Sequence, residues 1–135
     1  MTKPTAIVLD SWAVMAYFED EPAAKRFGDM IADAQQEGIR LLMSIVNVGE
    51  VWYSMARRRS PRDADEALRD LRSIGVEFID AKWPQTSIAA GYKAGGGISY
   101  ADCFAAALAK QTNATLITGD REFKKLESEI TIEWL

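Results

Sequence analysis

Short apolar runs alternate with helical segments along this chain, and that alternation restricts the possible folds more than any other feature. Residues 6–9 form a partly β-branched apolar run, which is the pattern of a strand buried in a parallel sheet. Strands that alternate with helices indicate right-handed βαβ units. The sequence therefore predicts an α/β fold, one domain over residues 1–135, with a central and mainly parallel sheet flanked by helices on both faces.

The other elements are predicted from apolar spacing and from residues that start or stop helices. Further strands are expected at 39–46, 76–79, 114–117 and, as an edge strand, 130–135. Helices are expected at 11–18, 22–37, 48–59, 61–74, 85–94, 100–111 and 121–126. Asn47 and Ser99 each precede an acid by three residues, which is the pattern of a helix capping box. A glycine triplet at 95–97 predicts a flexible loop.

The composition is that of a soluble globular protein, because 48% of the 135 residues are hydrophobic and 27% are charged. The apolar stretches are far shorter than the roughly 20 residues of a membrane span, and the N-terminus lacks the apolar segment of a secretory signal. We therefore expect a cytoplasmic protein without membrane contact. The single cysteine, Cys103, cannot form an internal disulfide and is expected to pack as a small buried hydrophobic residue.

Four acidic residues stand at the ends of apolar runs or at helix starts. Asp10, Glu50 and Asp120 follow strand candidates, so a parallel sheet would bring them to the edge where α/β folds bind ligands. Asp102 lies in the first turn of its helix, and the glycine loop could carry it to the same edge. Each acid alone is also explained as a helix cap. Within about 6 Å of one another, however, each pair would repel by roughly 3 kcal/mol at an effective dielectric of 20, a cost that a bound cation removes.

The chain contains no histidine, which narrows the chemistry open to these acids. Serine–histidine–aspartate triads, cysteine–histidine pairs, histidine bases and histidine-ligated zinc are all excluded. Oxygen ligands remain, and they suit hard cations such as Mg²⁺ or Mn²⁺. The sequence thus favours metal-dependent phosphoester chemistry.

The distribution of charge gives a mixed indication about nucleic acid. A net charge of −4 argues mildly against phosphate binding, which clustered lysine and arginine drive. Two basic clusters nevertheless occur, one of Arg57, Arg58, Arg59 and Arg62 and one of Arg121, Lys124 and Lys125. Cations at helix C-termini on a solvated face explain either cluster equally well.

Four stretches together resemble a known family. They are residues 7–11 (Ile-Val-Leu-Asp-Ser), 47–51 (Asn-Val-Gly-Glu-Val), 99–109 with Ser-Tyr-Ala-Asp at their start, and 116–123 with Thr-Gly-Asp-Arg-Glu-Phe at their end. Their order and spacing resemble a PIN domain and, more narrowly, the VapC-type toxins of prokaryotic toxin–antitoxin pairs. The resemblance covers the whole chain, and it implies an endoribonuclease that uses Mg²⁺ or Mn²⁺ to activate water for attack on an RNA phosphodiester.

The resemblance also implies roles for individual residues. Asp10, Glu50, Asp102 and Asp120 would form the catalytic metal centre, with Asp10 and Asp102 as the most direct ligands and the other two holding metal or orienting water. Ser11 and Thr118 would support the site, Ser11 by hydrogen bonding near the first acid, and Glu122 would replace or assist Asp120. Trp12 stands where relatives commonly have a small polar residue, which changes the shape of the rim.

The partners implied by the resemblance are RNA, a cognate antitoxin whose C-terminal segment covers the acidic site, and a second copy in a homodimer. The run Arg57 to Arg59 becomes a candidate for guiding RNA to the site. Aromatic residues that offer material for an interface, or for the core, are Trp12, Tyr17, Phe18, Trp52 and Tyr53.

Two other classes of function compete with this interpretation. An aspartate-based phosphotransfer enzyme would use Asp10 as nucleophile. Haloacid-dehalogenase-like enzymes place a second aspartate where this chain has Trp12, and a phosphoreceiver domain has an early acidic pair and a late lysine. The chain fits both of these families poorly. A noncatalytic PIN-like binding module would keep the fold and the acids as caps. Metal binding separates the module from the enzyme.

Overall fold

A computed structural model describes residues 4–135, so the predicted domain includes three residues, 1–3, that lie outside the described part. Five strands form one sheet in the order β3-β2-β1-β4-β5, and every neighbouring pair is parallel. The strands are β1 (Ala6–Leu9), β2 (Arg40–Ser44), β3 (Val76–Ile79), β4 (Thr115–Thr118) and β5 (Thr131–Trp134). The predicted α/β class and parallel sheet are confirmed, including the edge position of the last strand.

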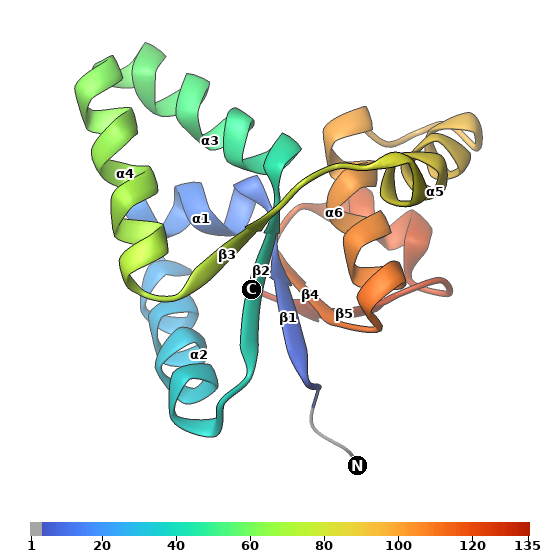
Figure 1. Cartoon of the computed structure of the whole chain (residues 1–135), viewed down its shortest axis with the longest axis horizontal. Coiled ribbons are helices and arrows are strands. Elements are labelled where there is room, and N and C mark those ends of the chain that lie inside the picture. Colours follow the sequence, from blue (N-terminus) through green and yellow to red (C-terminus); the bar gives the residue numbers. More distant parts are fainter. Residues whose placement is uncertain (1–3) are drawn as a thin grey trace.

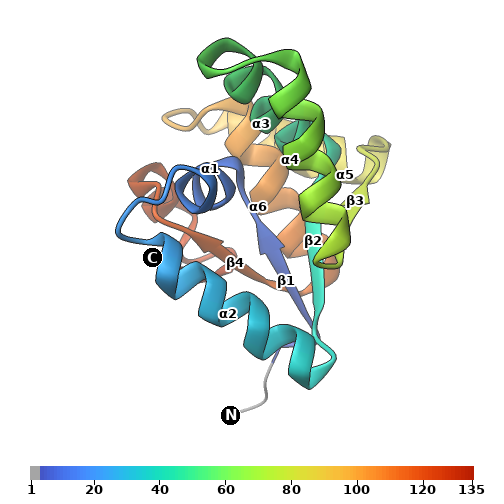
Figure 2. The ribbon, with the colours of Figure 1, turned by 90° about the vertical axis from the view of Figure 1, so that its left-hand side faces the viewer.

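Helices cover both faces of the sheet, as predicted (Figure 1). They are α1 (Ser11–Phe18), α2 (Ala24–Glu37), α3 (Ile45–Arg58), α4 (Pro61–Ser73), α5 (Trp83–Ala94), α6 (Tyr100–Thr112) and a short 3₁₀ helix, η1 (Arg121–Leu126). Figures 1 and 2 place α1 to α4 on one side of the sheet and α5 and α6 on the other. No helix in the described part of the chain has the length and apolarity needed to cross a membrane.

Side chains of successive strand residues alternate between two cores, one on each face of the sheet. In β1, Ala6 and Val8 join the core formed with α5, α6 and η1. Ile7 and Leu9 join the core formed with α1 to α4. All four residues are buried, which explains why the strand sequence is uniformly apolar.

The predicted starts of α1, α4, α6 and η1 are confirmed, α2 and α5 each begin two residues away from the predicted position, and the predicted start of α3 is wrong. The hydroxyl oxygen of Ser99 accepts a hydrogen bond from the backbone N–H of Asp102 at 3.2 Å, and that of Ser60 caps α4 in the same way. Asn47, by contrast, is not a cap. Helix α3 begins at Ile45, directly after β2, with Ser44 as its N-cap, so Asn47 and Glu50 both lie inside the helix. Ser44 ends the strand and starts the helix, so no turn remains for Asn47 to cap.

The order of the strands reverses at β1, and we call the region outside the carboxyl ends of β1 and β4 the crevice. From β1 the chain moves outward through β2 and β3, and it then returns to place β4 on the other side of β1. The connections after β1 and β4 therefore leave on opposite faces, and ligands of open α/β sheets bind at such a reversal. Asp10 follows β1 and Asp120 follows β4, so this crevice brings two of the predicted acids together.

Candidate active site

Asp10 is the buried acid at the end of β1, and its exposed fraction is 0%. It caps α1, because its Oδ1 accepts a hydrogen bond from the backbone N–H of Ala13 at 2.9 Å. Its Oδ2 accepts a hydrogen bond from the hydroxyl of Thr118. The pKa of this carboxyl is raised to about 7, mainly because the group is buried. The two hydrogen bonds lower the pKa, and the charges of Asp120 and Glu50 act in the same direction as burial.

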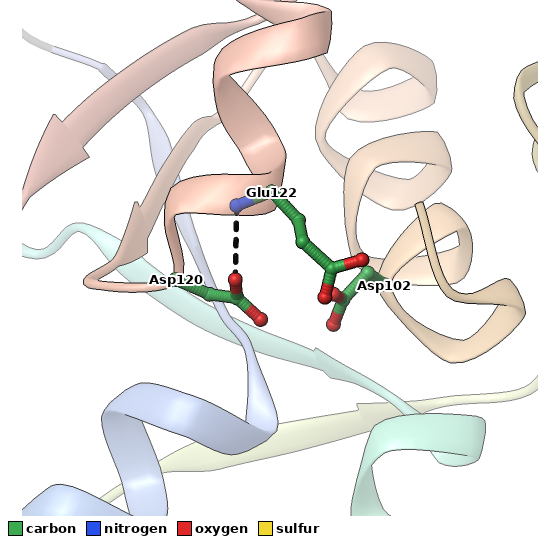
Figure 3. Close-up of side chains that lie close together, drawn as sticks. All are labelled: Asp102, Asp120 and Glu122. Carbon is green, nitrogen blue, oxygen red and sulfur yellow. Dashed lines mark hydrogen bonds between the residues drawn. The ribbon is translucent and has the colours of Figure 1, made fainter. Parts of the chain in front are cut away.

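Thr118 links the acids that follow β1 and β4. Besides donating to Asp10, its hydroxyl oxygen accepts the backbone N–H of Asp120 at 3.0 Å. Asp120 in turn caps η1, since its Oδ1 accepts the backbone N–H of Glu122 at 3.0 Å (Figure 3). A single hydroxyl thus sets the position of the loop after β4 relative to Asp10.

Asp102 reaches the same crevice from the first turn of α6. Three carboxylates gather there, from Asp102, Asp120 and Glu122 (Figure 3). Each has one oxygen within 4.8 Å of an oxygen of the other two. Burial raises the pKa of the Asp102 carboxyl to about 8, and the negative charges of Asp120 and Asp10 add to that effect. Asp102, Asp120 and Glu122 therefore form one acidic group, and Asp10 lies near enough for its charge to act on Asp102.

Glu50 contributes from α3, although not from the end of a strand as its position in the sequence suggested. Its Oε1 accepts hydrogen bonds from the hydroxyl of Ser11 at 2.9 Å and from the amide of Asn47 at 3.0 Å. Its charge also raises the pKa of Asp10. Glu50 lies outside the three-acid group of Figure 3, on the α3 side of the crevice.

These acids have no ion-pair partner in the described part of the chain. Among residues 4–135, no arginine or lysine forms an ion pair with Asp10, Glu50, Asp102, Asp120 or Glu122. Buried carboxylates without a counter-charge are costly, and a divalent cation relieves that cost. The donors are carboxylate oxygens, so the site fits a hard cation such as Mg²⁺ or Mn²⁺ by the chemistry of its ligands.

The predicted basic run is not part of the acidic cluster. Arg57, Arg58 and Arg59 are exposed at the end of α3, seven to nine residues after Glu50 and so roughly 10–14 Å further along the helix axis. Arg58 forms an ion pair with Glu19.

The aromatic residues proposed for an interface divide between two environments. Tyr17 and Tyr53 are exposed, whereas Trp12 and Phe18 pack against the core and Trp52 donates a hydrogen bond to Asp65.

Two contacts at the crevice were not expected from the sequence. Asn47 was predicted to be a cap, whereas its amide bonds Glu50, a contact that three-residue spacing on a helix allows. Trp12 packs its ring against Gly119, where an added Cβ would lie 2.2 Å from the indole Cη2. Only a residue without a side chain fits between Thr118 and Asp120 under that ring. No local sequence pattern indicates this second contact.

The parallel sheet with acids gathered at its topological reversal defines an acidic α/β site suited to hard cations. The PIN domain family model matches residues 7–129, which is most of the chain, and the chain therefore belongs to the PIN domain family, a family of nucleases. This membership favours the nuclease class over the two phosphotransfer families. The chain matches no curated protein sequence.

Several solved structures of toxin–antitoxin systems have the same fold. A chain of VapBC2 from Rickettsia felis, bound to a promoter DNA fragment, is 20% identical with a TM-score of 0.74, and the match covers 96% of this chain and 98% of that one. A chain of VapBC-1 from nontypeable Haemophilus influenzae is 18% identical with a TM-score of 0.73, and the match covers 96% of this chain and 97% of that one. VapC20 from Mycobacterium tuberculosis, a sarcin–ricin loop cleaving toxin, is 16% identical with a TM-score of 0.72, and the match covers 88% of this chain and 93% of that one.

Proposed function

We propose that this protein is a Mg²⁺- or Mn²⁺-dependent endoribonuclease that hydrolyses RNA phosphodiester bonds and acts as the toxin of a type II toxin–antitoxin pair. The observation that carries the proposal is the group of buried or half-buried carboxylates, without an ion-pair partner among residues 4–135, at the reversal of a PIN-family sheet. A group held only for helix capping would have no reason to bury Asp10 and Asp102 deeply enough to raise both pKa values.

The residues would divide the work according to their positions. Asp10 and Asp102 are the proposed direct ligands, because both are buried and the charge of Asp10 acts on Asp102. Asp120 and Glu50 would complete the centre or orient water, and Glu122 would assist Asp120, its close neighbour. When bound, the cation would neutralise the carboxylates, polarise the scissile phosphate and make water a better nucleophile.

Ser11 and Thr118 would act through the acids. The hydroxyl of Ser11 holds Glu50, and the hydroxyl of Thr118 holds Asp10 while it anchors the backbone of Asp120. Each hydroxyl would keep a carboxylate oxygen in one orientation. The loss of such hydrogen bonds around a metal centre typically costs about 10–100-fold in metal affinity or activity.

RNA and protein partners are proposed on separate grounds. Arg57 and Arg59 are exposed and form no ion pair among the described residues, so they are available to attract the RNA backbone toward an otherwise negative site. Similarity of fold to chains from VapBC complexes supports a cognate antitoxin that blocks the site. A homodimer in the cytoplasm completes the proposal.

The first test is cleavage of a panel of structured and single-stranded RNAs by the free protein, with Mg²⁺ or Mn²⁺ against EDTA. Asp102→Asn, prepared identically, controls for contaminating nucleases. Cleavage that requires metal and disappears in the variant supports the proposal. Equal behaviour of wild type and variant, with both proteins folded and metal present, would remove its main support.

Calorimetry with Mn²⁺ tests the alternative of a noncatalytic module. The enzyme requires a site that is lost or strongly weakened in Asp102→Asn. A module that keeps its acids only as caps would show the same heat of binding, or none, in both proteins.

A further inference from the structure

Asn47 contacts both sides of the candidate site from within α3. Its amide nitrogen donates one hydrogen bond to Glu50 Oε1 and another to the backbone oxygen of Ala101, each at 3.0 Å. Ala101 immediately precedes Asp102 in α6. One buried amide therefore connects the helix that carries Glu50 to the helix that carries Asp102.

The orientation of this amide is determined by its partners. A carboxylate and a backbone carbonyl can only accept hydrogen bonds, so the nitrogen of Asn47 must face them. Its Oδ1 is then left buried without a partner, and it is the one such side-chain atom within residues 4–135. A buried carbonyl without a hydrogen bond lowers stability. An apolar residue would avoid that cost, so packing alone does not account for asparagine at this position.

The consequence for Glu50 is a fixed carboxylate. Its Oε1 accepts two hydrogen bonds, from Asn47 and from Ser11, which approach from α3 and from the start of α1. No hydrogen bond from the described residues reaches its Oε2. The constrained oxygen thus leaves the other one available, and the charge of this carboxylate acts on Asp10 across the crevice.

We propose that Asn47 is a positioning residue that orients the Glu50 carboxylate for the metal centre, while its hydrogen bond to Ala101 anchors the amide on α6. This inference rests on the proposed function, because it treats Glu50 as part of that centre. Hydrogen bonds that orient metal ligands typically change metal affinity or activity by roughly 10–100-fold when they are lost.

The test compares Mn²⁺ affinity by calorimetry in wild type and in Asn47→Leu. Leucine has nearly the shape of asparagine, so it preserves packing while it removes both hydrogen bonds and the unpartnered oxygen. We expect a loss of Mn²⁺ affinity of at least about tenfold, with a melting temperature close to that of wild type. In a Glu50→Gln background the same substitution should have a much smaller effect, because the carboxylate that Asn47 orients is already gone.

Gln85→Leu is the matched control. Gln85 is also a buried amide that joins two elements, since its Oε1 accepts a hydrogen bond from the hydroxyl of Ser44 at 2.7 Å, but it contacts none of the acids. Its loss should leave Mn²⁺ affinity unchanged.

The outcomes separate the two proposals. Absence of Mn²⁺ binding to wild type would overturn the proposed function and this inference with it. Binding to wild type that is equally tight in Asn47→Leu would overturn the inference alone. An equal loss in the wild-type and Glu50→Gln backgrounds would also overturn it, because the effect would then not pass through Glu50.

Discussion

The candidate site has a buried half and an exposed half, and the two halves accommodate negative charge differently. Asp10 and Asp102 form the buried half, with exposed fractions of 0% and 6%, and burial raises their pKa values to about 7 and about 8. Glu122 is exposed and Asp120 half-buried, so water and salt screen their charges. At neutral pH the buried half therefore requires a proton or a cation, whereas the exposed half tolerates its charge.

The largest expected effect is the loss of activity in the buried half. Asp102→Asn should lower metal-dependent RNA cleavage by roughly 1,000-fold, because removing a direct ligand forfeits several kcal/mol of transition-state stabilisation. Single-turnover cleavage at saturating Mn²⁺ measures this. Cleavage within tenfold of wild type would show that the buried acid is not a ligand.

The metal-free protein should lose stability as the pH rises, on account of the buried half. An acid whose pKa is higher in the folded than in the unfolded state binds more protons when folded, so the free energy of unfolding falls through the window between the two values. For Asp10 that window runs from 3.8 to about 7. The loss is on the order of 4 kcal/mol by pH 8.

Urea denaturation in EDTA between pH 4 and 8 checks this prediction. Asp10→Asn should flatten the pH dependence relative to wild type, because an amide does not titrate. Parallel curves for the two proteins would mean that Asp10 is not desolvated as the structure indicates.

The contact between Trp12 and Gly119, beside Asp120, should be sensitive to added volume. Gly119→Ala would place a methyl group against the ring of Trp12 and should destabilise the fold by about 1–3 kcal/mol. Gly91→Ala is the control, since nothing lies within 4 Å of an added Cβ there and α5 should gain about 0.5–1 kcal/mol of helix stability. Equal melting temperatures for the two variants would contradict the close contact between Trp12 and Gly119.

The smallest effect is expected in the exposed half. Glu122→Gln removes a solvated charge, so Mn²⁺ affinity should fall by less than about tenfold while stability stays within roughly 0.5 kcal/mol of wild type. Calorimetry beside Asp102→Asn gives the comparison directly. If Glu122→Gln matched the loss in Asp102→Asn, the division of the site into two unequal halves would be wrong.

Local patterns were sufficient to predict the strands and the acids that follow them. The run before Asp10 and the run before Asp120 are short, apolar and partly β-branched, so they indicate buried strands without tertiary information. Ser99 and Asp102 likewise form a start signal that the fold uses as written. The prediction failed at Asn47, because Ser44 provides a competing start signal three residues earlier and the end of β2 selects it.

The sequence by itself determined the order of the strands and helices, that no histidine is available at the site, and that Asp10, Asp102 and Asp120 lie beside strand ends or helix starts. These properties depend on neighbouring residues and on composition, both of which can be read along the chain. Only the tertiary structure decided that Thr118 bonds Asp10, that Trp12 lies over Gly119, and that Asn47 joins Glu50 to the start of α6. Those contacts depend on how the helices cross the sheet, because their partners lie 54 or more residues apart in most cases.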